Sequence, residues 1–121
     1  MLIFADILSS TILFAVPLLL VALGGMFSER TGIINIALEG IMIIGALLSC
    51  LFLRAMDQIG WGAAHPQLAV FCAILVAALS GAVFSMLLAF ASVHLKANQT
   101  IGGTALNMLA PAFAVVLTWA I

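Results

Sequence analysis

Sparse charged residues divide the chain into four long apolar stretches. A bilayer core of about 30 Å needs roughly 20 apolar residues in a helix, and each stretch reaches that length. Backbone groups in lipid must be satisfied internally, and barrel strands would alternate polar and apolar residues, so the spans are predicted as helices. Pro17 predicts a bend in the first one. The pattern predicts an all-α, polytopic transmembrane protein with spans at about 7–27, 33–53, 68–93 and 101–121.

Composition narrows the class of function. The 121 residues are 67% hydrophobic and 6% charged, whereas soluble domains average about 45–50% apolar and about 25% charged residues. A net charge of −1 offers no electrostatic basis for a nucleic-acid partner. The only lysine, Lys96, is not part of a phosphate-binding loop, so any ATP must be bound by another chain. His65, His94, Cys50 and Cys72 stand apart from one another, and therefore no enzyme activity, cofactor or metal site is predicted.

The second stretch contains two polar residues that are unusual in a membrane span. If this stretch is one continuous helix, a face of polar or small side chains results: Gly32, Asn35, Glu39, Ala46 and Cys50. A carboxylate at the centre of a spanning helix costs about 2.5–3.5 kcal/mol, so we expect Glu39 to face protein or a cavity and not lipid. Two interpretations stay open. Glu39 either pairs with or caps a neighbouring segment, or it shapes a polar path for a ligand together with Asn35 and Asn107.

The fourth stretch opens with the sequence NQTIGGTALNMLAP. Its polar positions share one helical face with a proline: Thr100, Thr104, Asn107 and Pro111. Gly102 and Gly103 weaken the helix, so an irregular backbone is expected here. Such backbone is tolerated at membrane depth where it is buried in protein or lines a cavity, as in the broken helices of transporters.

The third stretch has a stripe of small residues every four positions: Ala73, Ala77, Gly81, Ser85 and Ala89. Small residues at this spacing let helix backbones approach closely in lipid, so the stripe predicts a helix-packing face. The alternative interpretation is that it lines a transport path.

Two sequence stretches resemble one protein family. GGMFSERTGIINIALEGIMIIGA, from Gly24 to Ala46, is similar to the signature of bacterial ABC-importer permeases for nucleosides and simple sugars. LKANQTIGGTALNMLAP, from Leu95 to Pro111, is similar to a second stretch of that family at the expected distance. The resemblance covers nearly the whole chain and is strongest to the nucleoside-type permeases.

The resemblance implies a multi-pass permease subunit in the bacterial inner membrane. Its implied partners are cytoplasmic ATP-binding subunits, a second permease subunit, an extracytoplasmic substrate-binding lipoprotein and the lipid bilayer. The side chains that the resemblance places near the translocation path are Asn35, Glu39, Asn98, Thr100 and Asn107. Permeases of this family have about twice as many spans, so we expect residues 1–121 to be the N-terminal portion of a permease.

A function of a different class is a small, non-transporting membrane protein that packs as an assembly subunit. Composition does not separate it from a permease, whereas the two polar stretches and the resemblance favour the permease. An intramembrane enzyme lacks paired catalytic carboxylates, a metal cluster and a nucleophile–base pair.

Overall fold

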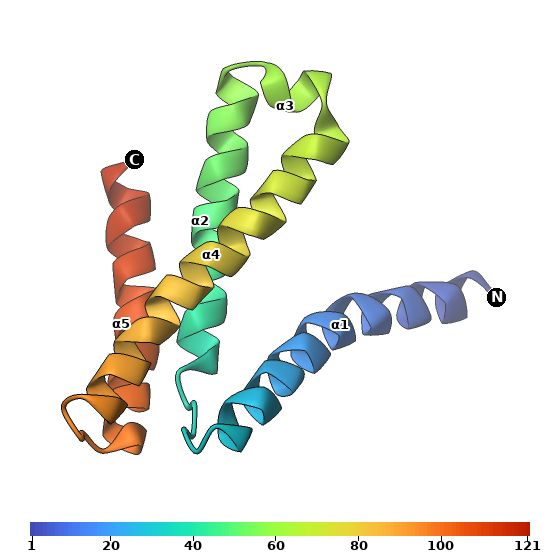
Figure 1. Cartoon of the computed structure of the whole chain (residues 1–121). Coiled ribbons are helices and arrows are strands. Elements are labelled where there is room, and N and C mark those ends of the chain that lie inside the picture. Colours follow the sequence, from blue (N-terminus) through green and yellow to red (C-terminus); the bar gives the residue numbers. More distant parts are fainter. The chain divides into compact units, whose positions relative to one another are not determined.

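The computed structural model describes all residues, 1–121, and contains helices but no strands. The helices are α1 (Leu2–Arg30), α2 (Leu38–Gln58), α3 (Trp61–Ala64), α4 (Pro66–Val93) and α5 (Gln99–Ala120). Four of them, all except α3, are long and apolar enough to cross a membrane. The predicted all-α class with about four spans is therefore confirmed (Figure 1).

The first of two compact units, Met1–Ile34, consists of α1 and the turn that follows it. Pro17 lies inside α1, where it has no N–H to donate to the helix. Figure 1 shows α1 bending near its middle, the part of the helix that contains Pro17. After Arg30 the chain turns, because Gly32 adopts a φ of +86° and its N–H donates to the Glu29 carbonyl at 3.0 Å.

The second unit, Asn35–Ile121, contains the other helices. In this unit α2 packs against both α4 and α5, while α3 lies at the turn between α2 and α4 (Figure 1). Its buried hydrophobic residues are mostly small, with four alanines among them: Ala37, Ile44, Ala69, Ala73, Leu88 and Ala110. Small residues allow backbones to approach and make van der Waals contact, which is the main source of helix association in lipid.

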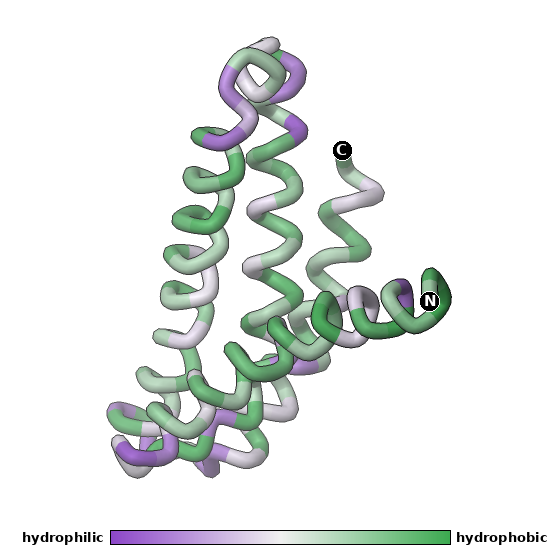
Figure 2. The backbone as a smooth tube through the Cα atoms, turned by 90° about the vertical axis from the view of Figure 1, so that its right-hand side faces the viewer, coloured by the Kyte–Doolittle hydropathy of each residue, from purple (hydrophilic) through white to green (hydrophobic).

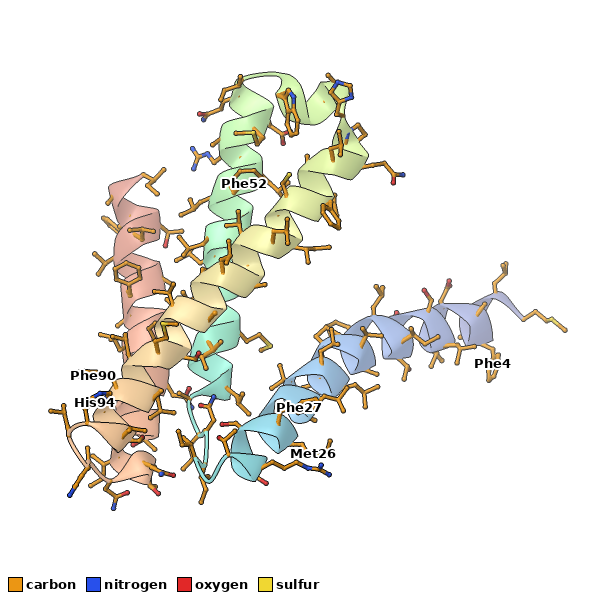
Figure 3. All side chains as sticks on the ribbon, viewed as in Figure 1. Phe4, Met26, Phe27, Phe52, Phe90 and His94 are labelled. Carbon is orange, nitrogen blue, oxygen red and sulfur yellow. The ribbon has the colours of Figure 1, made fainter.

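Polar residues gather at the two ends of α2 and α4, and hydrophobic residues fill the lengths between them (Figure 2). At one end, the rings of Trp61 and His65 meet edge to face, with centroids 6.0 Å apart. At the other end, Phe90 and His94 stack in the last turn of α4, with centroids 4.9 Å apart (Figure 3). Aromatic residues with a polar edge suit the boundary between membrane and water, so the rings at both ends fit a spanning orientation of α4.

Each of the four long helices overlaps one of the predicted spans, with different bounds. Helix α1 begins five residues before position 7, and α5 begins two residues before position 101. Helix α2 is the one that begins late: it starts at Leu38 and not near residue 33. This late start determines the geometry of the candidate site.

Candidate functional site

The segment that leads into α2 is not helical. Between Arg30 and Leu38 the backbone turns and then runs irregularly. The Asn35 side-chain oxygen accepts the Ala37 N–H at 3.1 Å, a local bond that competes with helix formation. Gly32, with its positive φ, cannot belong to an α-helix either. The predicted common face of Gly32, Asn35 and Glu39 on one helix is therefore wrong, because only Glu39 of these residues lies in α2.

The irregular backbone predicted at Gly102 and Gly103 is also wrong. Helix α5 runs without interruption from Gln99 to Ala120, because close packing at Gly103 compensates for the weak helix propensity of glycine. A carbon added at the Cβ position of Gly103 would lie 2.9 Å from Cβ of Ile36. The glycine thus lets the irregular segment before α2 lie directly against α5.

One side chain of α5 joins the backbone on both sides of the start of α2. The Asn107 side-chain oxygen accepts the Gly40 N–H at 2.8 Å, and its nitrogen donates to the Ile36 carbonyl at 2.7 Å. We call this pair of hydrogen bonds the Asn107 bridge. It satisfies a carbonyl outside α2 and one of the first-turn N–H groups, which have no partner within the helix.

The surroundings of the Asn107 bridge are tightly packed. Ala37 and Ala110 are both 0% exposed. A Cβ at Gly40 would stand 3.0 Å from the Asn107 side-chain oxygen and 3.0 Å from the Leu106 carbonyl oxygen. On α5, Gly103, Asn107 and Ala110 lie on one face at helical spacing, and this face contacts the start of α2.

Glu39 is exposed and lies in the first turn of α2, one residue before Gly40. Arg54 follows it by 15 positions, or about 22 Å of helix. If Arg54 marks one boundary of a core about 30 Å thick, Glu39 is expected roughly 8 Å inside the other boundary. The start of α5 supports this depth, because Asn107 is the ninth residue of that helix, about 12 Å from its beginning.

A carboxylate in this position is stabilised by the N-terminal end of the α2 dipole, by about 0.3–1 kcal/mol at an exposed site. The polar side-chain contact between α2 and α5 is made by Asn107. Both interpretations of Glu39, pairing or capping and a ligand path, stay predictions. The carboxylate is directed away from the buried face of α2, which contains Gly40 and Ile44.

The remaining polar candidates of α5 lie at its beginning. Asn98 is the N-cap, and its side-chain oxygen accepts the Thr100 N–H at 2.9 Å. Thr104 donates within its own helix, to the Thr100 carbonyl at 3.0 Å. Asn98 precedes Asn107 by nine residues, about 13 Å along the helix. The structure thus groups Asn35, Glu39 and Asn107 around the start of α2 and leaves Asn98 and Thr100 at the beginning of α5.

The stripe of small residues on α4 faces α2 over part of its length. Ala73 and Gly81 are buried, and Ala77, Ser85 and Ala89 are half-buried. A Cβ at Gly45 of α2 would stand 3.3 Å from the Ala77 carbonyl oxygen, and one at Gly81 would stand 3.2 Å from Cγ2 of Ile41. These contacts place Ala77 and Gly81 in the packing between α2 and α4.

The sequence reasoning missed Ile36 and Gly40 as residues of the site, and it gave Gly103 a helix-weakening role and not its packing role. Ile36 contributes only its carbonyl, so its side chain offers no signal. Gly40 and Gly103 could have been found as small residues next to the polar positions Glu39 and Thr104, a pattern that indicates close helix approach in membranes.

Comparisons with known proteins agree with the resemblance. Residues 7–121 match the family described as "Branched-chain amino acid transport system / permease component". The guanosine ABC transporter permease protein NupQ of Bacillus subtilis is 49% identical over 104 residues, which are 86% of this chain and 31% of that protein. The nucleoside ABC transporter permease protein NupC of Lactococcus lactis is 43% identical over 111 residues, 92% of this chain and 33% of that protein.

The chain thus spans about a third of the length of these curated relatives. No solved structure matches it.

Proposed function

Because the chain belongs to the family of branched-chain amino acid transport system permease components, we propose that it forms part of the membrane path of an ABC importer for nucleosides. The observation that carries this proposal is the exposed carboxylate of Glu39 in the first turn of α2, a helix long and apolar enough to cross a membrane, which we infer to begin below the membrane surface. Irregular backbone and helix ends at such depth are typical of substrate sites in transporters.

The chemistry of the site suits a nucleoside. A carboxylate only accepts hydrogen bonds, and the ribose hydroxyls and ring N–H groups of a nucleoside donate them. The two relatives are described as guanosine and nucleoside permeases, and guanine presents several N–H donors. A simple sugar offers hydroxyl donors as well, so competition between ligands has to distinguish the two classes.

The proposal includes the partners that ATP-driven import requires. Separate cytoplasmic ATP-binding subunits hydrolyse the ATP, since this chain has no phosphate-binding loop. A second permease subunit completes the path, and an extracytoplasmic lipoprotein delivers the ligand. The permease itself carries out no covalent chemistry and resides in the bacterial inner membrane as a multi-pass protein.

Uptake by the complete importer tests the proposal. The transporter that contains this chain is purified, reconstituted in liposomes with its ATP-binding subunits, and supplied with binding protein and labelled guanosine. We expect ATP-dependent uptake that other nucleosides inhibit more strongly than ribose or glucose does. Absence of uptake from a fully assembled complex would contradict a role in nucleoside import and would favour an assembly subunit.

Glu39→Gln tests the role of the carboxylate in the same assay. Glutamine keeps the size of the side chain and removes its charge, and hydrogen bonds to a charged group contribute about 1.5–3 kcal/mol. We expect uptake per assembled complex to fall about tenfold or more, with assembly unchanged. Glu29→Gln is the matched control, since Glu29 is an exposed glutamate in the last turn of α1. Equal uptake by both variants and the wild type would remove Glu39 from the path.

A further inference from the structure

Asn107 was predicted as a residue of the ligand path, but its amide group is already occupied by backbone. Its oxygen accepts from Gly40 at 2.8 Å and its nitrogen donates to Ile36 at 2.7 Å. A carboxamide carries both functions on one rigid group, and the two backbone partners require one of each. This complementarity also fixes which amide atom is oxygen and which is nitrogen.

Helix α2 depends on this side chain because it lacks a cap of its own. Its N-cap residue is Ala37, with no side-chain hydrogen bond to the helix, and alanine is among the poorest N-cap residues. The Gly40 N–H, three residues after Ala37, is the group that an N-cap side chain normally satisfies. Asn107, 67 positions further along the chain, takes over this role from a neighbouring helix.

The Asn107 bridge also sets the direction of Glu39. Neighbouring residues of a helix point about 100° apart. The bridge holds Gly40 against α5, and the buried Ala37 and Ile44 lie on the same side of α2. Glu39 must then point away from this packed side, where the structure shows it exposed.

We propose that Asn107 is a positioning residue, which caps α2 from α5 and thereby holds the Glu39 carboxylate outward, and that it makes no hydrogen bond to the ligand itself. The part of this statement that concerns the ligand rests on the proposed function. The cap and the direction of Glu39 rest on the geometry alone, so the two parts can be tested separately.

Amide hydrogen exchange of the purified chain in lipid nanodiscs tests the cap. Asn107→Ala should raise the exchange rate of the Gly40 N–H at least about tenfold, with little change beyond the first two turns of α2. Tenfold corresponds to about 1.4 kcal/mol. Asn98→Ala is the matched control, because the Asn98 side chain bonds Thr100 within its own helix. It should speed exchange at the start of α5 and leave Gly40 unchanged.

An unchanged Gly40 rate in Asn107→Ala would overturn the cap. If that variant does not fold, the wild-type chain provides the measurement. The Asn107 side-chain N–H that donates to Ile36 should exchange slowly, and fast exchange of both side-chain protons would overturn the bridge.

A double-mutant cycle in the reconstituted importer tests whether Asn107 affects uptake through Glu39. Asn107→Ala alone should lower uptake per assembled complex. In a Glu39→Gln background it should lower uptake less than twofold further, because a residue that acts through Glu39 has no effect once the carboxylate is gone. An additional loss as large as that of the single variant would identify Asn107 as an independent ligand contact and overturn the proposal. Absence of uptake by the wild type would refute the proposed function and leave the exchange result standing.

Discussion

Replacing Gly40 by alanine tests whether close approach of α2 and α5 stabilises the fold. The new Cβ would lie 3.0 Å from the Leu106 carbonyl oxygen, 3.0 Å from the Asn107 side-chain oxygen and 3.3 Å from Cβ of Ala110. Two of these neighbours are rigid parts of α5, so the methyl group cannot be accommodated by rotation of one flexible side chain. The helices must move apart, and the Gly40 N–H must then move away from Asn107.

Two opposing contributions determine how much Gly40→Ala changes the free energy of unfolding. Overpacking a tight contact costs about 1–3 kcal/mol. Alanine has a better intrinsic helix propensity than glycine, by about 1 kcal/mol in a helix interior and less at an end. We expect a net loss of about 1–2 kcal/mol in the free energy of unfolding for Gly40→Ala.

Gly102→Ala is a matched control because it has the same gain in propensity without the tight contact. Its added carbon would lie 3.4 Å from Cδ1 of Leu88, an ordinary van der Waals distance to the end of a flexible side chain. This variant should be neutral or more stable by up to about 1 kcal/mol. Reversible unfolding of the chain in mixed micelles, followed by circular dichroism, measures both values. Equal stability of the two variants would refute the inferred contact between α2 and α5.

Three further substitutions probe other contacts. Gly81→Leu should destabilise the packing of α2 and α4 by about 1–3 kcal/mol and lower the yield of folded chain in membranes, because even an added Cβ would stand 3.2 Å from Cγ2 of Ile41. Unchanged folding and yield would contradict the packing role. Gly103→Ala should displace the segment before α2, because the added Cβ would lie 2.9 Å from Cβ of Ile36. Proteolysis after Arg30 should then become faster, and an unchanged rate would argue against the contact between Gly103 and Ile36. Asn98→Ala should cost about 1 kcal/mol through loss of the α5 cap, measured by thermal unfolding. Thr118→Val is the control, because the Thr118 hydroxyl donates only within α5, to the Val115 carbonyl among others; a shift in melting temperature no larger than that of the control would argue against the cap.

The all-α class and the number of spans could be predicted because they depend on local composition. About 20 apolar residues between charges predict a spanning helix without knowledge of any neighbour. The start of α2 could not be predicted in this way, because isoleucine and alanine in the segment before it are compatible with a helix in lipid. The hydrogen bond from the Ala37 N–H to the Asn35 side chain and the turn at Gly32 prevent a helix here, and neither feature changes the hydrophobic pattern.

The candidate site, too, could be predicted from the sequence only in part. The polar character of Glu39 and Asn107 was visible in the sequence, and so was their unusual place in apolar stretches. Their different roles were not, because a hydrogen bond to backbone 67 positions away has no sequence signal. Gly103 was misleading for a related reason: without knowledge of its contact with Ile36, a glycine that permits close packing cannot be distinguished from one that breaks a helix.

The Asn107 bridge joins residues that are far apart in the sequence, and this separation has a consequence for biosynthesis. Gly40 leaves the ribosome 67 residues before Asn107, and at roughly 5–20 residues per second the interval is about 3–13 s. During this time the Ile36 carbonyl and the Gly40 N–H must find water or another temporary partner, since unsatisfied groups in lipid cost several kcal/mol. The Asn107 bridge, and with it the final packing of α2 against α5, can therefore form only after α5 has been synthesised.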